Sequence, residues 1–503
     1  MKPIEILRKE LKIVTDLRGA SSLLQWDQET YMPAGAGAIR AEQIALLDTL
    51  SHEHLVGDLV SGPLGELVDL DTGEPKWGLS DEESRLVREI WKDYHRAIAL
   101  PKEFVEEYSQ TTSMAQQIWA QARKENNFTK FAPILEKVIK LKFREIDYLG
   151  VKTTPYDILL DYFEPGMTSA YVTVLFDAVK ERLIPLVQKI AASGVDTGVE
   201  LLRRDYDVDK QWDFGVKILE DMGYDLNIGR QDKSAHPFTT SFHPTDVRIT
   251  TRFNKNNLLS ALSSTIHEGG HALYEQGMDP EWYGTPFCDA VSYGIHESQS
   301  RLWENLVGLS KPFWSYYFPR LQKVFPENLS NISLDDFYRA VNTIEPSLIR
   351  VEADEATYNL HIMLRFEVEK LIINDRIPVA ELPELWNDKM EEYLGVRPGT
   401  DAEGVLQDVH WSFGGFGYFP TYALGNLYNV PIFNQAQNEI EDLDIKIASG
   451  NLIELRNWLG EKVHRVGRRR TAAELIVDIT GKKLSANPFM DYLEDKYKEV
   501  YLL

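Results

Sequence analysis

The stretch Val172–Leu186, VTVLFDAVKERLIPL, carries the pattern that decides the fold class. Counted from its first residue, apolar residues recur three, four, seven, eleven and fourteen positions later, which draws one stripe down an α-helix. Thr168 lies just before it as a candidate helix cap. A strict four-residue spacing from Leu86 to Ile98 predicts another helix, and comparable stripes continue to the C-terminus. The sequence therefore predicts a mostly helical protein.

The stretch Pro237–Phe253, PFTTSFHPTDVRITTRF, breaks this helical pattern. Its β-branched and aromatic residues favour a short strand or a hairpin. A period of two would place Val247 and Ile249 on one face and Asp246, Arg248 and Thr250 on the other. We therefore expect a small sheet beside the helical body.

The length of 503 residues is compatible with two or three average domains or with one large body. No repeat of 20 to 50 residues and no long linker rich in Gly, Ser or Pro interrupts the chain. We therefore predict a single domain over residues 1–503, with a bilobed form left open.

Charge and composition exclude several classes of partner. The formal net charge of -24 would repel a phosphate backbone, so we expect no nucleic-acid partner. The run Arg468–Arg470 is the local exception, and the apolar segment after it favours a solvated helix start over a binding patch. A single cysteine, Cys288, fits a reducing compartment. Without a run of eighteen apolar residues or a signal peptide, we expect a cytoplasmic protein that does not bind membranes.

The stretch Ser264–Tyr274, STIHEGGHALY, contains a candidate metal-binding motif. On a helix, His267 and His271 lie one turn apart on one side and could bind the same ion, while Glu268 lies about 100° round. The alternative is coincidence, because a chain with 11 histidines matches this pattern by chance in roughly one case in fifty. The two glycines between Glu268 and His271 each cost roughly 1 kcal/mol in a helix, and close backbone approach would explain them.

A third ligand would complete such a site, because catalytic zinc binds three protein groups and keeps one open position. Glu297 falls 26 residues after His271, which leaves room for the first helix to end and a second helix to return across the ion. The alternative for Glu297 is a surface carboxylate. We interpret the neighbouring His296 as a structural histidine that points elsewhere.

An ordered series of motifs carries a resemblance to a known family. The motifs are HPF at 236–238, DVRIT at 246–250, HEGGH at 267–271, HESQ at 296–299, IRVEAD at 349–354, GVLQDVHW at 404–411 and FGYFPTY at 416–422. Through nearly its whole length the chain resembles the thermostable metallocarboxypeptidases of the carboxypeptidase Taq type. The resemblance implies a saddle-like helical architecture, similar in outline to neurolysin and angiotensin-converting enzyme, with a deep groove. It also implies a homodimer.

Peptide hydrolysis assigns roles to the residues at this site. Zinc held by His267, His271 and Glu297 would activate a water, and Glu268 would take its proton and pass it to the leaving amine. Negative charge on the tetrahedral intermediate calls for further donors, for which the family similarity favours His410. Tyr418 or Tyr422 would be a second donor, and the alternative for both tyrosines is an aromatic core cluster.

An exopeptidase must also recognise a terminal carboxylate, which a planar guanidinium matches in bidentate fashion. Arg350 is the leading candidate and Arg248 the second, while a structural salt bridge is the alternative for each. On a helix started by Arg350, Asp354 would share its face and would hold the arginine or support a zinc histidine.

These expectations converge on a zinc metallocarboxypeptidase that removes single residues from peptides with a free C-terminus, with broad specificity. Two alternatives stay open: an endopeptidase or dipeptidyl carboxypeptidase on the same zinc centre, and a non-catalytic peptide-binding protein. Cobalt or manganese would fit the same nitrogen and oxygen ligands as zinc. Neither the preferred side chains nor the physiological substrates follow from the sequence.

Overall fold

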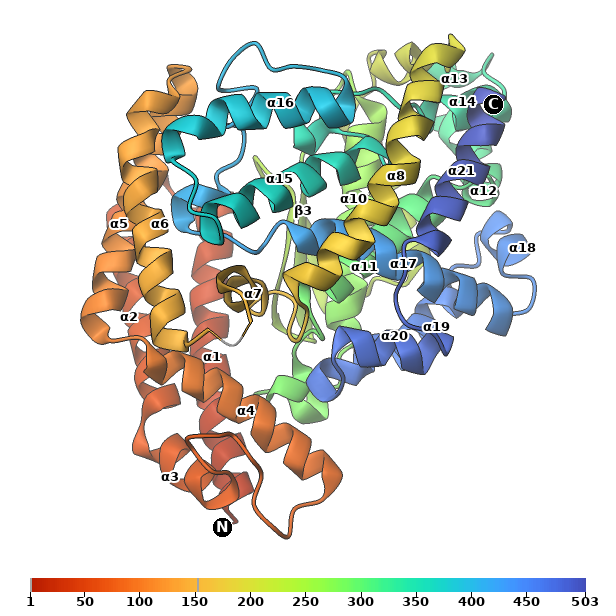
Figure 1. The fold of residues 1–503 in the computed structure, drawn as a ribbon. Coiled ribbons are helices and arrows are strands. Elements are labelled where there is room, and N and C mark those ends of the chain that lie inside the picture. The colour runs from red at the N-terminus through yellow and green to blue at the C-terminus, as the bar shows by residue number, and fades with distance from the viewer. Residues whose placement is uncertain (1, 152) are drawn as a thin grey trace.

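The computed structural model describes residues 2–151 and 153–503, and it is mostly helical with one small sheet (Figure 1). The N-terminal helices are α1 (Pro3–Thr30), α2 (Gly37–Val56), α3 (Asp58–Leu67), α4 (Asp81–Ala99), α5 (Lys102–Lys124), α6 (Phe128–Leu149) and α7 (Pro155–Leu160). The central helices are α8 (Ser169–Ser193), α9 (Val208–Met222), α10 (Leu258–Gly277), α11 (Tyr293–Arg301), α12 (Lys311–Val324), α13 (Pro326–Leu329), α14 (Leu334–Val341) and α15 (Thr357–Ile373). The C-terminal helices are α16 (Leu382–Leu394), α17 (Pro420–Glu439), α18 (Leu443–Ala448), α19 (Ile453–Lys462), α20 (Ala472–Thr480) and α21 (Asn487–Tyr501).

Shorter helical segments join these elements. One is a π-helix, η5 (Leu302–Gly308), which continues directly from α11. The others are 3₁₀ turns: η1 (Ala34–Ala36), η2 (Val199–Arg203), η3 (Pro280–Trp282), η4 (Pro286–Cys288), η6 (Arg350–Glu352), η7 (Val379–Glu381), η8 (His410–Phe413) and η9 (His464–Arg469).

The predicted helical stripes are buried as expected. Helix α8 begins after Thr168, whose side chain accepts a hydrogen bond from the backbone N–H of Tyr171, and its stripe from Val172 to Leu186 faces the core. In α4 the stripe is buried as far as Tyr94, but Ile98 near the helix end is exposed. The three- and four-residue spacing therefore predicted these helices correctly, although Ile98 of α4 does not join the core.

The predicted strand region forms a sheet with one strand more than expected. Strands β2 (Phe238–His243) and β3 (Asp246–Thr251) pair antiparallel, and β1 (Gly229–Lys233) pairs parallel to β3, which gives the order β1-β3-β2. The inner face of β3 buries Val247 and Ile249 completely, as the period of two predicted. The sequence of β1, GRQDK, lacks β-branched and aromatic residues, so its pairing with β3 had no local signal.

The buried apolar side chains form a large cluster and a small one. The small cluster gathers residues of α1, α3 and α4 around Phe287, and the large one takes in most of the remaining helices and β3. In Figure 1 the helices from α1 to α6 lie along one side of the molecule, and β3 lies near its centre. Among the helices of the described ranges, none combines the length and apolar character needed to cross a bilayer.

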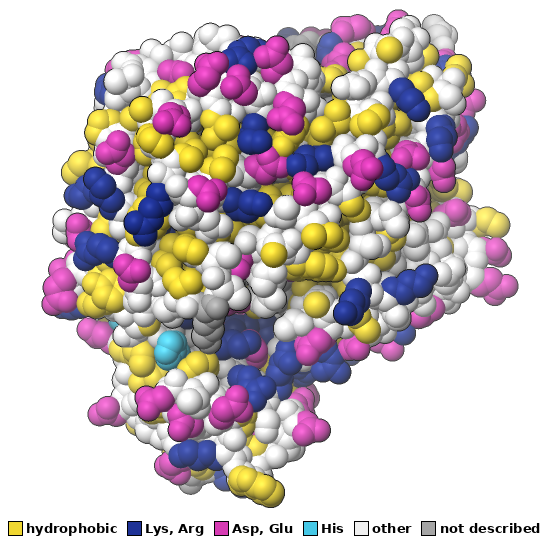
Figure 2. Space-filling view, viewed as in Figure 1, with side chains coloured by type: hydrophobic (Ala, Val, Ile, Leu, Met, Phe, Trp, Pro, Cys, Tyr) yellow, Lys and Arg dark blue, Asp and Glu magenta, His cyan; other side chains and the backbone are white. Residues whose placement is uncertain are grey.

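The arginine run does not begin a solvated helix, which corrects that expectation. Arg468 belongs to η9, and α20 begins later, after the capping residue Thr471. The Arg468 guanidinium donates to Glu89 and Asp93 of α4, and only 15% of its side chain is exposed. Lys and Arg side chains gather in the hollow between α4 and α20 in Figure 2. Glu89 and Asp93, which are distant from Arg468 in the chain, thus balance the charge of this arginine.

Candidate metal centre and active site

A cavity of about 880 Å³ opens where α10, α11, β2, η6 and the start of α17 meet. His267, Glu268 and His271 reach it from α10, and Glu297 reaches it from α11. The first helix ends at Gly277 and the second begins at residue 293, as the spacing between the two motifs predicted.

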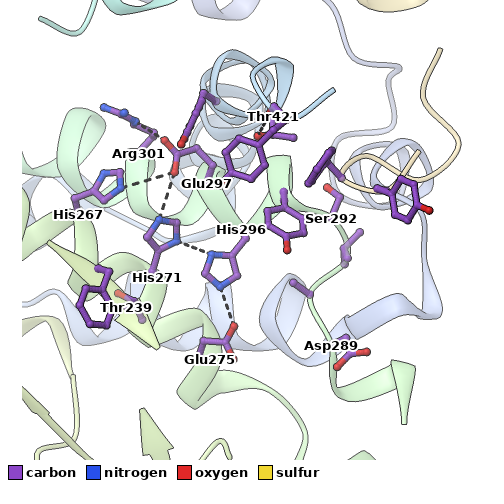
Figure 3. A pocket seen from close by; sticks show the side chains of 18 of the residues that line it. Thr239, His267, His271, Glu275, Asp289, Ser292, His296, Glu297, Arg301 and Thr421 are labelled. Atoms are coloured by element: carbon purple, nitrogen blue, oxygen red, sulfur yellow. Dashed lines mark hydrogen bonds and ion pairs between the residues drawn. The ribbon is translucent and has the colours of Figure 1, made fainter. Parts of the chain in front are cut away.

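Three side chains converge at the floor of the cavity (Figure 3). Glu297 Oε2 lies 3.3 Å from His271 Nε2 and 3.7 Å from His267 Nε2. One candidate ligand atom from each of these residues lies within 4.8 Å of the other two. Two imidazole nitrogens and a carboxylate oxygen form the donor set that metals such as zinc prefer.

Glycines allow the metal-site helices to touch backbone to backbone. A Cβ atom on Gly270 would lie 2.7 Å from the Gln299 carbonyl oxygen and the Ser300 Cα of α11. A Cβ on Gly425 of α17 would lie 2.7 Å from the Glu297 side chain on the opposite side. The close approach inferred from the paired glycines is therefore present, and it brings the carboxylate of α11 against the histidines of α10.

His267 is oriented by a second carboxylate that sequence reasoning missed. Its Nδ1 lies 2.8 Å from Glu304 Oε2, in the π-helix η5. Arg301 joins the two carboxylates, with its Nε donating to Glu297 and a terminal nitrogen donating to Glu304. The spacing of 297, 301 and 304 places all three side chains on one helical face, which was the available signal. Such partners fix the ring orientation of a metal-binding histidine.

His296 does not point away from the site, which corrects its interpretation as a remote structural histidine. Its Nδ1 makes a close contact with Nδ1 of His271, and its Nε2 lies 2.8 Å from Glu275 Oε1 (Figure 3). Both His296 and Glu275 line the cavity. The second metal-site histidine is thus held by another imidazole and, through it, by a carboxylate.

The neighbouring groups shift the pKa values of the two histidines in opposite directions. Burial opposes protonation of His267, but Glu304 and Glu297 raise its pKa to about 8. Burial and the adjacent His296 lower the pKa of His271 to about 3. Burial alone would raise the pKa of Glu297, but Arg301 and His267 bring it below the usual carboxyl range. An ionised carboxylate and a neutral imidazole are the forms that bind a cation.

Glu268 lines the same cavity without an arginine partner. Its Oε2 accepts a hydrogen bond of 2.7 Å from Thr239 Oγ1 on β2, and only 7% of the residue is exposed. Burial raises its pKa above the usual value. A carboxylate in this setting gains a proton readily, as a general base must.

Arg350 lies at the cavity wall, but its support differs from the prediction. It belongs to the short turn η6, separate from α15, and Asp354 caps α15 through the backbone N–H groups of Ala356 and Thr357. Asp354 therefore holds neither Arg350 nor a metal histidine. Asp408 holds Arg350 instead, accepting from Nε at 3.0 Å and from a terminal nitrogen at 2.8 Å.

The buried cluster around Arg350 carries an unbalanced positive charge. Asp408 also pairs with Arg365, which is fully buried, so two guanidinium groups share one carboxylate. Burial lowers the pKa of His361 to about 3 and that of His410 to about 4, which keeps both rings neutral at pH 7. One positive charge is thus left for a ligand at the cavity wall.

The aromatic segment after η8 divides between the cavity and the core. Tyr418 and Tyr422 line the cavity, while His410 lies behind them, with its ring centroid 5.5 Å from that of Tyr418. Buried Glu369 of α15 anchors this segment by accepting from Trp411 Nε1 at 2.9 Å and Gly417 N at 3.0 Å. Trp411, Phe416 and Phe419 thus belong to the aromatic core, while Tyr418 and Tyr422 face the cavity.

Arg248 is not brought to this cavity. Its guanidinium pairs with Asp246 at 2.8 and 2.9 Å and lies 4.4 Å from the centre of the Trp26 ring of α1. From the neighbouring HPF motif, Pro237 and Phe238 do line the cavity. The DVRIT motif thus joins the sheet to α1 through its arginine.

The fold is helical, and one cavity holds the two histidines of a His-Glu-x-x-His motif together with a glutamate from a second helix. This combination is typical of a metal-dependent peptidase. The family described as carboxypeptidase Taq (M32) metallopeptidase matches residues 6–497. The chain belongs to this family of metallocarboxypeptidases.

Relatives agree with this assignment over the full length. Carboxypeptidase 1 of Bacillus subtilis is 40% identical, over 98% of this chain and 97% of its own. Thermostable carboxypeptidase 1 of Thermus thermophilus is 42% identical, over 96% of each chain. The crystal structure of an M32 carboxypeptidase from Deinococcus radiodurans superimposes with a TM-score of 0.95 at 39% identity, covering 100% of both chains.

Proposed function

We propose that the protein is a zinc-dependent carboxypeptidase that removes single residues from the free C-terminus of peptides, with broad side-chain specificity. The observation that carries this proposal is one cavity with a metal-ligand triad at its floor and an unbalanced arginine cluster in its wall. The triad supplies hydrolytic chemistry, and the arginine cluster supplies a site for a terminal carboxylate.

We assign His267, His271 and Glu297 to hold the metal, with zinc as the resident ion and cobalt or manganese as substitutes. The convergence of three nitrogen and oxygen donors, including an ionised carboxylate, fits a divalent cation. When bound there, such a cation would activate a water and polarise the scissile carbonyl. The remaining steps fall to side chains of this chain.

Glu268 acts as general base in this proposal. Thr239 orients its carboxylate, and the raised pKa allows Glu268 to take a proton from the attacking water and pass it to the leaving amine. Tyr418 donates to the developing oxyanion from the cavity wall, and His410 supports it from behind.

Arg350 receives the terminal carboxylate, and Tyr422 forms the adjoining wall, with its ring centre 5.2 Å from the Arg350 guanidinium. A carboxylate there would balance the charge that Asp408 leaves between two arginines. Arg248 becomes the weaker candidate for this role, because Asp246 and Trp26 already occupy its guanidinium.

Cleavage of a peptide and of its C-terminally amidated twin tests the exopeptidase assignment. We expect the amide to react at least about tenfold more slowly, because a neutral amide loses a charge-assisted pair with Arg350. Equal rates would favour an endopeptidase on the same centre, and release of dipeptides, seen by mass spectrometry, would favour a dipeptidyl carboxypeptidase. A chelator without effect on any cleavage would revive the non-catalytic binding protein.

The proposal extends to the architecture and setting of the enzyme. We propose one domain over residues 1–503, with a bilobed form left open, and by resemblance the saddle-like helical architecture with a deep groove shared with neurolysin and angiotensin-converting enzyme. We also propose a homodimer, which light scattering of the purified protein would test. The single free cysteine supports a reducing, cytoplasmic setting.

A further inference from the structure

Tyr358, in the first turn of α15, stands in the cavity wall between two arginines and has no role in the mechanism above. The residue is only 5% exposed, and it lines the cavity. The guanidinium of Arg301 lies 4.3 Å from the centre of its ring, and a terminal nitrogen of Arg350 donates to its hydroxyl at 3.1 Å. The phenol therefore adjoins both the metal-site arginine and the proposed carboxylate site.

The hydroxyl of Tyr358 accepts one hydrogen bond and keeps a proton to donate. Among residues 2–151 and 153–503, no acceptor lies within hydrogen-bond reach of that proton. Burial raises the pKa of Tyr358, so the phenol stays protonated at neutral pH. A buried donor without a partner is costly, which favours an acceptor supplied from the cavity.

The hydrogen bonds of Arg350 show where that acceptor would lie. Its Nε and one terminal nitrogen face Asp408, and the other terminal nitrogen faces Tyr358. One hydrogen on each terminal nitrogen is left for a ligand. A carboxylate seated on this edge of the guanidinium would have an oxygen beside the Tyr358 hydroxyl.

We propose that Tyr358 is a substrate-binding residue whose hydroxyl donates to the terminal carboxylate of the peptide, alongside Arg350. This inference rests on the proposed recognition of that carboxylate by Arg350. A C-terminal amide has one oxygen and an N–H₂ group that cannot accept a hydrogen bond. Bound in the same place, an amide would leave either Tyr358 or Arg350 with an unpaired buried donor, so Tyr358 sharpens selection for free C-termini.

Tyr358→Phe tests this role, because it removes the hydroxyl and keeps the ring against Arg301. The probes are L-phenylalanine, as a competitive inhibitor with a free carboxylate, and L-phenylalaninamide, in which an uncharged amide replaces that carboxylate. We expect the variant to bind L-phenylalanine roughly tenfold more weakly and the amide unchanged, since only the carboxylate accepts this hydrogen bond fully. Metal content and melting temperature should stay close to the wild type.

Tyr317→Phe is the matched control. Tyr317 is also buried, and its hydroxyl bonds Asp221 outside the cavity, so its loss should leave inhibition by L-phenylalanine unchanged. Arg350→Ala separates the inference from the function on which it rests. If Arg350→Ala keeps the preference for acid over amide, the proposed carboxylate site is wrong, and the role of Tyr358 falls with it. If Arg350→Ala loses this preference while Tyr358→Phe binds L-phenylalanine as the wild type does, the role of Tyr358 alone is overturned.

Discussion

Two buried carboxylates beside the cavity, Glu297 and Asp408, differ from two in the helical core, Glu164 and Glu369, in the groups that face them. At the cavity, Arg301 and His267 lower the pKa of Glu297, and two arginines lower that of Asp408, although burial alone would raise both. In the core, Glu164 and Glu369 meet only neutral donors, and burial raises the pKa of each to about 7.

The difference shows two solutions to the cost of burying a carboxyl group. The core residues accept several hydrogen bonds each: Glu164 joins the start of α11 to Tyr428 of α17, and Glu369 joins α15 to Tyr156 and the segment after η8. The cavity residues instead keep a permanent negative charge, because guanidinium groups are fixed against them. Fixed charge is thus placed where a cation and a substrate carboxylate are proposed to bind.

Glu268 belongs to neither group, and replacing it gives the largest expected effect on activity. Like the core carboxylates it is buried with a raised pKa, but it opens into the cavity. We expect Glu268→Gln to lower kcat by about 10³-fold or more, because the proton acceptor is lost. Steady-state kinetics and metal analysis of the purified variant check this. Activity near the wild-type level with bound metal would remove Glu268 as the base.

Asp408→Asn tests whether the buried charges beside the cavity stabilise the fold in addition to forming the proposed substrate site. The substitution leaves two buried guanidinium groups without a carboxylate, which should lower the free energy of unfolding by about 3–5 kcal/mol. Urea unfolding followed by circular dichroism measures the loss. As a control, Asp388→Asn removes an exposed partner of Arg397 and should change stability by less than about 1 kcal/mol. Equal effects of the two substitutions would contradict the importance of the buried cluster.

Glu369→Gln tests the core group through the dependence of stability on pH. A rise in pKa from 4.5 to about 7 means that the folded protein keeps a proton over a range in which the unfolded chain has lost it. The contribution of Glu369 to the free energy of unfolding therefore falls by about 3 kcal/mol as pH rises from about 4.5 to 7. Gln does not titrate, so the wild type should lose stability relative to the variant between pH 5 and 8.

Unfolding midpoints of both proteins across that range measure this difference. Glu384→Gln, which changes an exposed carboxylate, is the control and should follow the wild-type curve. Parallel curves for wild type and Glu369→Gln would show that Glu369 titrates alike in both states. The contrast between the two groups of carboxylates would then be smaller than the structure indicates.

Much of the helical frame and the convergence of the candidate metal ligands followed from the sequence. The stripe in α8 and the pair His267 and His271 are local patterns, set by 3.6 residues per turn. The proposed carboxylate ligand Glu297 was predicted because its distance from His271 fits one loop and one helix. Strand β1 was missed, since GRQDK pairs with β3 without any strand propensity of its own.

The sequence by itself determined which segments are helical, which side of α10 carries the histidines, and that an acidic residue of the next helix could join them. Only the tertiary structure decided which charges meet: Glu304 with His267, Asp408 with Arg350, and Arg468 with α4. Helical and strand periods repeat over a few residues and can be seen in the chain. The partners of Arg350 and Arg468 come from segments many residues away, and packing of whole helices brings them within hydrogen-bond distance.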